Sequence, residues 1–277
     1  MKRHNQQYYL TENDIQELHK VELELLVEFD RICRKYDIAY SIDGGTLLGA
    51  IRHKGFIPWD DDADVIMNRR AYQKFVSVLD KELDLDKFYF QDMKLTSGYR
   101  WGYGKLRYAN TEFVRLDQEY MPYKQGVFLD VFVCDNVPDN YFMRCLCNLH
   151  SFIYRKAFYS EVGKHTAEGW SKFIYQILNI IPEGKLKKSY YRYINFRNTK
   201  QTEWVKCLTF PACNKVFGYK RKWYEDVIDI EFEGVMLKGC RDYDEYLTFL
   251  YGDYMKLPPI SKRKIHPVSK LILPQDT

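Results

Sequence analysis

Three features that would identify common classes of protein are missing from this 277-residue chain. No stretch approaches the ~20 apolar residues that span a bilayer, and the first ten residues lack the apolar core of a secretory signal. The seven cysteines form no CxxC pair and no Cys/His zinc spacing. We therefore expect reduced, buried thiols in a cytoplasmic protein, with contact at the inner face of the cell membrane left open.

A strong charge of either sign is also missing. Lys and Arg number 42 against 38 Asp and Glu, a net charge of +4. This excess is too small to indicate nucleic acid as a partner, and it is compatible with a phosphate-bearing substrate. Aromatic residues are abundant, at 17% of the chain. Their number suits core packing, sugar stacking or cation recognition, and composition alone does not choose among these.

Hydrophobic periodicity predicts an α+β fold with a small mixed sheet. We expect a catalytic core in residues 1–138 and a mainly helical part in 139–277 that completes the substrate site, and the two parts could form one unit. The predicted helices are 11–36, 44–52, 70–83, a helical region 140–197 broken near Pro182, and 242–251. The predicted strands are 38–42, 60–67, 88–93, 104–114, 127–133, 205–210 and 232–238.

Four aspartates occur within five residues, at positions 60, 61, 62 and 64. Carboxylates this close repel one another unless a cation neutralises them. If residues 60–67 form a strand, alternation puts Asp60, Asp62 and Asp64 on one face. Oxygen ligands of this type select Mg²⁺ or Mn²⁺ rather than zinc. Read alone, the run could equally be a solvated turn or a calcium loop.

The segment before the aspartates offers a site for a phosphate group. Gly44 and Gly45 open a predicted helix, whose N-terminal N–H groups favour an anion close to the main chain, and Thr46 adds a hydroxyl. Arg52 and His53 follow before the acids and are candidates for binding the donor diphosphate. A glycine pair is more often only a turn.

A further acid and two cations lie on later strands. Asp130 stands alone in the apolar segment 127–133, where a carboxylate is costly to bury without a partner. It could complete the metal site, act as a base, or be a satisfied structural carboxylate. Lys105 and Arg107 share one face of a strand and are candidates for donor diphosphate binding, or ordinary edge-strand residues. Taken together, glycine turn, short helix, acidic strand and later strand acid form the layout of a nucleotidyltransferase-type site.

The residues from Asp43 to Asp64, reading DGGTLLGAIRHKGFIPWDDDAD, resemble the signature of the LicD family. The resemblance continues through 126–133 and returns at 251–259 (YGDYMKLPP), while 140–230 carry little of it. The family usually has a larger aliphatic residue at position 63, where this chain has Ala63.

This resemblance implies a nucleotidyltransferase-like fold, Mg²⁺ use, and transfer of phosphocholine from CDP-choline to a cell-surface glycan or its precursor, with release of CMP. It also extends to the fukutin group, so the phospho-alcohol stays open. Asp62, Asp64 and Asp130 are then the catalytic candidates, and these three with Asp60 the metal ligands.

Two further regions of the sequence each allow two interpretations. In the C-terminal motif, Asp253 and Tyr254 are candidates for substrate contact, or Asp253 caps a turn. His266 is expected to be a surface residue, with a phosphate or proton partner as the alternative. The apolar helix near 173–181 and the basic stretch after it suit either a membrane surface or a core helix with a solvated neighbour, and we favour the second.

Three rival functions remain open: a nucleotidyltransferase that releases pyrophosphate, a catalytically silent glycan-binding member of the fold, and a glycosyltransferase. The intact Asp62, Asp64 and Asp130 argue against the silent member. The glycine element before the acids argues against the glycosyltransferase.

Overall fold

A computed structural model of the chain describes residues 7–211, 214–263 and 265–274. Of the seven cysteines, Cys213 lies outside these residues, and the six described ones are free thiols. None of the helices in these residues combines the length and apolarity needed to cross a bilayer.

The first helix, α1 (Glu12–Lys35), begins as its sequence predicts. Thr11 accepts a hydrogen bond from the backbone N–H of Asp14, and the Asp14 carboxylate accepts one from the N–H of Thr11. This reciprocal capping satisfies two amide groups that would otherwise lack partners. One face of α1 is then buried against the sheet, from Ile15 to Cys33.

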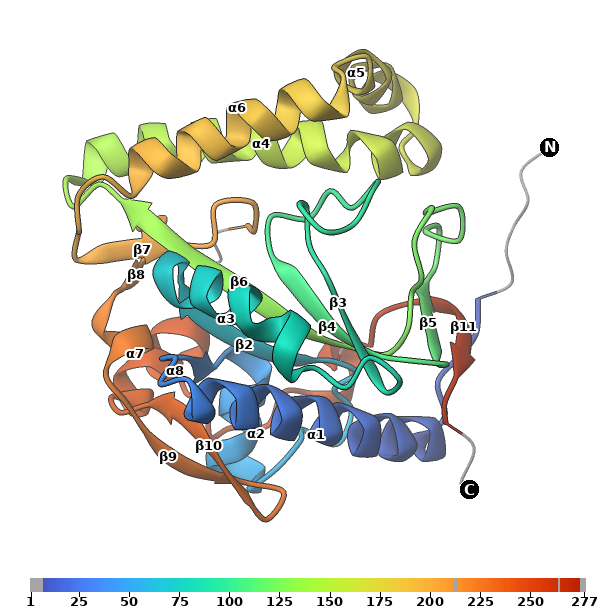
Figure 1. The fold of residues 1–277 in the computed structure, drawn as a ribbon, viewed down its shortest axis with the longest axis vertical. Helices are drawn as coiled ribbons and strands as arrows, with labels where there is room; N and C mark the ends of the chain where they lie inside the picture. Colours follow the sequence, from blue (N-terminus) through green and yellow to red (C-terminus); the bar gives the residue numbers. More distant parts are fainter. Residues whose placement is uncertain (1–6, 212–213, 264, 275–277) are drawn as a thin grey trace.

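Nine strands of the described chain form one mixed sheet, which confirms the predicted α+β class (Figure 1). Its main path runs β3-β4-β6-β2-β1-β10-β9, and β7 and β8 extend from the far end of β6. β2 and β6 are parallel, as are β1 and β10, and the other pairs are antiparallel. The strands are β1 (Ser41–Ile42), β2 (Ala63–Asn68), β3 (Phe88–Gln91), β4 (Gly104–Tyr108), β6 (Phe128–Val137), β7 (Trp204–Lys206), β8 (Tyr219–Lys220), β9 (Val227–Phe232) and β10 (Val235–Cys240).

The sheet takes strands from both sides of residue 138, because β9 and β10 join β1 at its edge. Helices α1 and α3 (Arg69–Glu82) cover one face of it (Figure 1). Helices α2 (Gly44–His53), α7 (Lys222–Glu225) and α8 (Tyr243–Tyr251) also pack against its strands. A separate two-stranded sheet pairs β5 (Glu112–Arg115) with β11 (Val268–Ile272). A short 3₁₀ helix, Ile260–Lys262, precedes β11 in the chain.

Three long helices form a layer at the opposite end of the molecule from the β9–β10 hairpin (Figure 1). They are α4 (Tyr141–Thr166), α5 (Gly169–Asn179) and α6 (Glu183–Arg197), with the break that Pro182 predicts. A second hydrophobic cluster lies under α4 and α6 and includes Tyr99, Tyr154, Tyr190 and Leu208.

Several predicted strand boundaries are wrong. The strand expected from Asp60 begins at Ala63, so three of the four aspartates precede it in a loop. The strand expected over 104–114 is two strands, because Asn110 turns the chain with φ 57°. The strand expected over 232–238 contains a hairpin turn at Glu233 and Gly234, both with positive φ. Strand β7 ends at Lys206 rather than at 210.

Candidate active site

Asp64 and Asp130 lie directly beside each other on neighbouring parallel strands. They are register partners in the β2–β6 pair, and Lys105 is the register partner of Asp130 in the β4–β6 pair. Residues in register point to the same face, so the three side chains form one row across the sheet. The Lys105 ammonium donates a hydrogen bond to Asp130 in a buried ion pair. Burial lowers the pKa of Lys105 to about 7, and its ammonium lies 3.3 Å from the Phe128 ring centroid.

The glycine turn lies against the acids. A Cβ added to Gly45 would lie 2.6 Å from Asp60 Oδ2, and one added to Gly44 would lie 3.8 Å from Asp64 Oδ2. Gly44 also has φ +50°, in the region that favours glycine. Thr46 Oγ accepts a hydrogen bond of 2.8 Å from the Asp64 N–H. The two glycines therefore allow carboxylates to approach the N-terminus of α2.

The loop before β2 is fixed by residues far away in the sequence. The buried Asp61 accepts hydrogen bonds from the His266 backbone N–H (3.0 Å) and from His266 Nδ1 (3.1 Å), which raises the pKa of His266. Arg115 on β5 lies 3.5 Å from Asp62 Oδ2. Potential ligand atoms of Asp61, Asp62 and His266 lie within 4.8 Å of one another.

Glu22 is an additional acid that faces this group from α1. Its side chain is buried, and its Oε2 has no hydrogen-bond partner among the described residues. Burial first, and then the charges of Asp62, Asp61 and Asp60, raise its pKa well above the usual value. Burial together with neighbouring carboxylates likewise raises the pKa of Asp60 to about 7 and that of Asp64 well above its usual value.

These features fit a hard divalent cation. Lys105 and Arg115 do not offset all of these carboxylates, which raise one another's pKa values beside an unpartnered buried oxygen, and oxygen donors are the ligands that Mg²⁺ and Mn²⁺ prefer. Asp60, Asp62, Asp64 and Asp130 are the residues that we predict to hold it. The pKa of Asp62 is raised by burial in spite of His266 and Arg115.

The other predicted cations bind other protein groups, although the Arg107 guanidinium also lies 5.3 Å from the Phe128 ring centroid that Lys105 contacts. Arg107, also buried, donates to Gln91 Oε1 (2.6 Å) and to the Gly126 carbonyl (2.5 Å). Arg52 and His53 lie at the C-terminal end of α2, roughly 12 Å along the helix from Gly45 at 1.5 Å per residue. Arg52 donates a hydrogen bond to the carbonyl of Tyr254 (2.7 Å). The segment 43–64 therefore contacts the C-terminal motif at 251–259.

In that motif, Asp253 is exposed, and its carbonyl accepts the N–H of Lys256. The Tyr254 hydroxyl donates to Asp244 at 2.7 Å. Tyr251 is closer to the acids, because its hydroxyl would lie 3.7 Å from a Cβ on Gly44. Tyr246 donates to Asp43, the residue before the glycines, whose pKa is raised to about 6 by burial.

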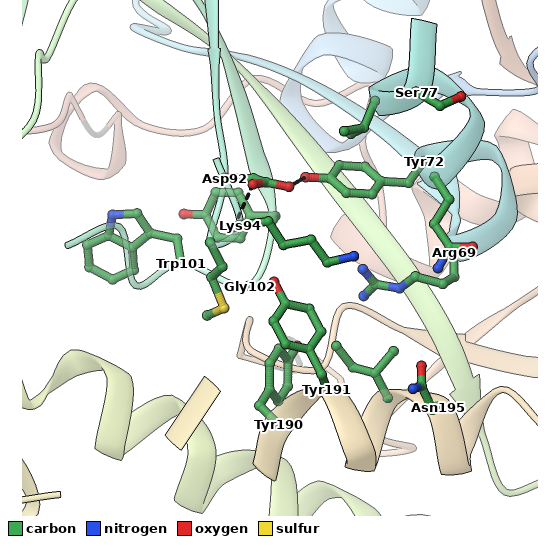
Figure 2. Close-up of a pocket in the computed structure, with 15 residues that line it drawn as sticks. Arg69, Tyr72, Ser77, Asp92, Lys94, Trp101, Gly102, Tyr190, Tyr191 and Asn195 are labelled. Carbon is green, nitrogen blue, oxygen red and sulfur yellow. Dashed lines mark hydrogen bonds between the residues drawn. The ribbon is translucent and has the colours of Figure 1, made fainter. Parts of the chain in front are cut away.

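A cavity of about 470 Å³ lies between α3, α6 and the segment before β4 (Figure 2). Tyr72, Tyr190 and Tyr191 supply aromatic walls, and Arg69 and Lys94 reach into it (Figure 2). Arg69 is paired with the buried Asp135 at 2.6 Å, and Asp92 also lines the cavity, so its walls carry charges of both signs. Tyr103 lines the cavity, and its ring centroid is 5.7 Å from the Lys105 ammonium, so the cavity adjoins the acidic row.

Sequence reasoning missed Glu22 and Arg115. The surface position expected for His266 is confirmed, but its contact with Asp61 was not predicted. The sequence could have indicated that Glu22 is buried, because it stands four residues after Leu18 and three before Leu25, on the buried stripe of α1. No local pattern indicated the positions of Arg115 and His266. The β5–β11 pairing that brings them to the loop before β2 joins segments about 150 residues apart.

Comparisons with known proteins identify the family of the chain. The family model described as LicD/FKTN/FKRP, nucleotidyltransferase domain, matches residues 37–177. The chain is 32% identical over 262 residues to the lipopolysaccharide cholinephosphotransferase LicD of Haemophilus influenzae, covering 92% of this chain and 97% of that protein. It is also 24% identical over 119 residues to an uncharacterized protein of Rickettsia prowazekii, covering 43% of this chain and 41% of the relative.

Proposed function

The chain belongs to the LicD family of transferases, and from this premise we propose that it transfers phosphocholine, or a similar phospho-alcohol, from a CDP-linked donor to a hydroxyl of lipopolysaccharide or a related cell-surface glycan. The Haemophilus relative, which is similar along almost its whole length, supports phosphocholine as the group transferred. The single structural observation that supports phosphoryl-group chemistry is the row of Asp64, Asp130 and Lys105 beside the Gly44–Gly45 turn.

The donor diphosphate is placed between the glycine turn and this row. The first N–H groups of α2 have no partners within the helix, and the helix dipole favours an anion at that end. Lys105 adds a positive charge from the other side. Donor binding near the acids then requires that their negative charge be offset.

Asp60, Asp62, Asp64 and Asp130 would hold the Mg²⁺ or Mn²⁺ that offsets it. When bound, such an ion supplies charge neutralisation at the diphosphate and polarises the phosphoryl oxygens. Glu22 adds a further buried carboxyl group beside these aspartates, and its Oε2 has no hydrogen-bond partner among the described residues.

The transfer itself is an in-line displacement. The oxygen of the acceptor hydroxyl forms a bond to the phosphorus of the phosphocholine group, and the bond from that phosphorus to the bridging diphosphate oxygen breaks. Asp130 is placed to take the hydroxyl proton. CMP leaves with the bonding electron pair, and the Lys105 charge partly balances its new negative charge.

The first test is CMP release from CDP-choline by the purified protein, with Mg²⁺ or with EDTA, using D62N as the control. We expect CMP only with the metal and only with the unsubstituted protein. Pyrophosphate as the product from a nucleoside triphosphate would instead indicate a nucleotidyltransferase. Full activity of D62N would refute the assignment of the site.

A further inference from the structure

We propose that the outer face of the α4–α6 layer is a docking surface for an anionic phospholipid bilayer. The surface is defined here by two apolar stripes, one on each of α4 and α5, and by a basic stripe on α6. Docking on the bilayer does not depend on the transfer activity, whereas the use of this surface to reach a lipid-anchored acceptor rests on the proposed function.

The apolar stripes are unusual for a surface in contact with water. Residues 141–197 make up a fifth of the chain but hold half of the exposed large hydrophobic residues among the described ones. On α4, exposed apolar side chains recur at helical spacing, and on α5 they do so again. The stripe on α4 is Phe142, Leu146, Leu149 and Ile153, and the stripe on α5 is Trp170, Phe173, Ile174 and Ile177.

Their exposure is large. Trp170 is 83% exposed and Ile180, directly after α5, is 76% exposed. Single exposed apolar residues are ordinary, but a row of them on each of two helices in contact marks an interaction surface. A tryptophan at the end of an apolar stripe suits the boundary between lipid headgroups and acyl chains, where its ring is favoured.

Charge selects the bilayer over a second copy of the chain. Residues 141–197 contain ten Lys and Arg against three Asp and Glu, whereas acidic residues outnumber basic ones in the rest of the chain. On α6, the exposed Lys185, Lys188 and Arg192 recur at helical spacing. Two copies meeting through this layer would bring like charges together. An anionic headgroup layer attracts each such cation.

The same layer leads toward the acidic row. Helix α4 supplies Arg155, Lys156 and Tyr159 to a cavity of about 420 Å³, and Tyr103 forms part of its opposite wall. Tyr103 also lies beside Lys105, the partner of Asp130. A glycan anchored in the bilayer therefore has a basic, aromatic cavity between the docked helix and the site.

Vesicle flotation of the full chain tests the proposal without donor or acceptor. We expect flotation with vesicles of phosphatidylglycerol and phosphatidylcholine in equal parts, and weak flotation with phosphatidylcholine alone. Raising the salt from about 0.1 M to about 1 M shortens the Debye length from about 10 Å to about 3 Å and should weaken it. Absence of flotation with the anionic vesicles would overturn the proposal.

Matched variants locate the surface. I174S/I177S should bind roughly tenfold more weakly or worse, because two exposed isoleucines lose their apolar burial. K185E/K188E should lose the preference for anionic lipid. L85S, which changes an exposed leucine before β3, should bind as the unsubstituted chain does. Equal binding by I174S/I177S would contradict this location, and a concentration-dependent dimer abolished by I174S/I177S would assign the face to self-association instead.

A second measurement is independent of how the double variants fold. Brominated lipids should quench tryptophan emission in the unsubstituted chain, and much less so in W170F. D62N should float normally, so failure of the transfer assay and failure of membrane binding are separate results. Quenching that is the same in W170F would remove α5 from the contact.

Discussion

Asp64 and Asp130 are register partners on the parallel strands β2 and β6, although 65 other residues separate them in the chain. This pairing places two carboxylates side by side, with Lys105 next in the row. Their closeness is costly for the fold unless charge is balanced, which indicates that the arrangement serves chemistry rather than stability.

The first prediction concerns this pair. D64N and D130N should each lower CMP release by about 10²-fold or more, because each removes charge from the site that offsets the donor diphosphate. The double variant should be little worse than either single one, since residues that act as a unit are not additive. D80N, an exposed aspartate on α3, is the control. Losses that multiply in the double variant would show that the two act separately.

The second prediction tests the approach of the glycine turn to the acids. G45A should displace the Asp60 carboxylate, since the new Cβ would lie 2.6 Å from Oδ2. We expect at least a tenfold fall in kcat with little change in the unfolding midpoint, because a small misplacement of a catalytic group is costly. Gly184 on α6 has open space around it, so G184A is the matched control and should retain activity. Unchanged kcat in G45A would show that the Asp60 position is not critical.

The site was predictable where its residues are close in sequence, and less so where the tertiary structure brings them together. Capping by Thr11 and the helix after Gly44 followed from local chemistry. Asp60 was placed on a strand because alternating acidic and apolar residues imitate the period of two, but the chain stays irregular until Ala63. The contacts of Arg115 and His266 depend on the β5–β11 pairing, which no local pattern specifies.

The third prediction concerns the stability of the buried Lys105–Asp130 pair. K105M should cost about 3–5 kcal/mol of unfolding free energy in EDTA, because it leaves a buried carboxylate without its partner. K105M/D130L should recover part of this loss. K220M, which breaks the exposed pair of Lys220 with Glu245, should cost less than about 1 kcal/mol. Urea unfolding measures all three, and a cost for K105M no larger than for K220M would argue against the buried pair.

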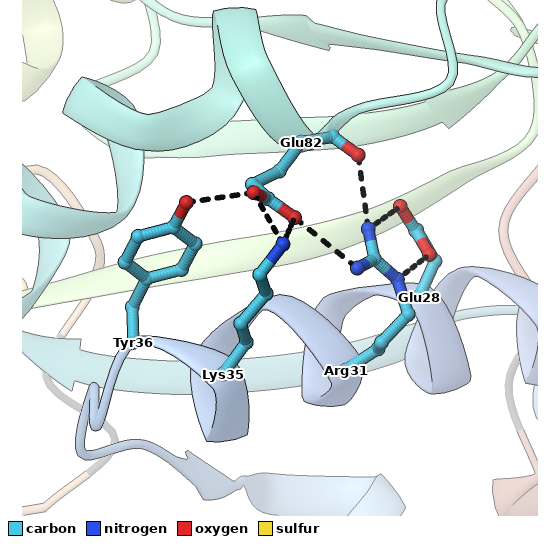
Figure 3. Close-up of polar contacts among 5 residues, drawn as sticks. All are labelled: Glu28, Arg31, Lys35, Tyr36 and Glu82. Carbon is cyan, nitrogen blue, oxygen red and sulfur yellow. Dashed lines mark hydrogen bonds and ion pairs between the residues drawn. The ribbon is translucent and has the colours of Figure 1, made fainter.

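The fourth prediction concerns Glu82, the last residue of α3, whose side chain contacts residues at the C-terminal end of α1 (Figure 3). Its carboxylate accepts hydrogen bonds from Lys35 (2.7 Å), Tyr36 (2.6 Å) and Arg31 (3.3 Å). The bond from Lys35, then that from Tyr36, lowers the pKa of Glu82 from 4.5 to about 2. Because the folded pKa is depressed, the stabilisation is complete above about pH 4.5 and is lost as the pH falls toward 2.

E82Q should therefore lower the urea midpoint at pH 7, and its difference from the unsubstituted chain should disappear near pH 2. D80N, two residues earlier on α3, should show no such pH-dependent difference. A difference for E82Q that stays constant from pH 7 to pH 2 would show that the carboxylate charge is not the cause.

The last prediction concerns Glu22, whose folded pKa is raised rather than lowered. In this case the folded chain binds the proton more tightly than the unfolded chain, so stability falls as the pH rises above 4.5. In EDTA at pH 8, E22Q should be more stable than the unsubstituted chain, because it removes the cost of ionising a buried carboxyl group. The difference should shrink as the pH falls toward 4.5. Mg²⁺ should raise the unfolding temperature of the unsubstituted chain more than that of E22Q, because only the former keeps the buried negative charge beside the site. If E22Q is instead the less stable protein at pH 8 in EDTA, a contact within the protein stabilises the Glu22 carboxylate. Its charge would then stabilise the folded chain without a bound cation, which would contradict this prediction.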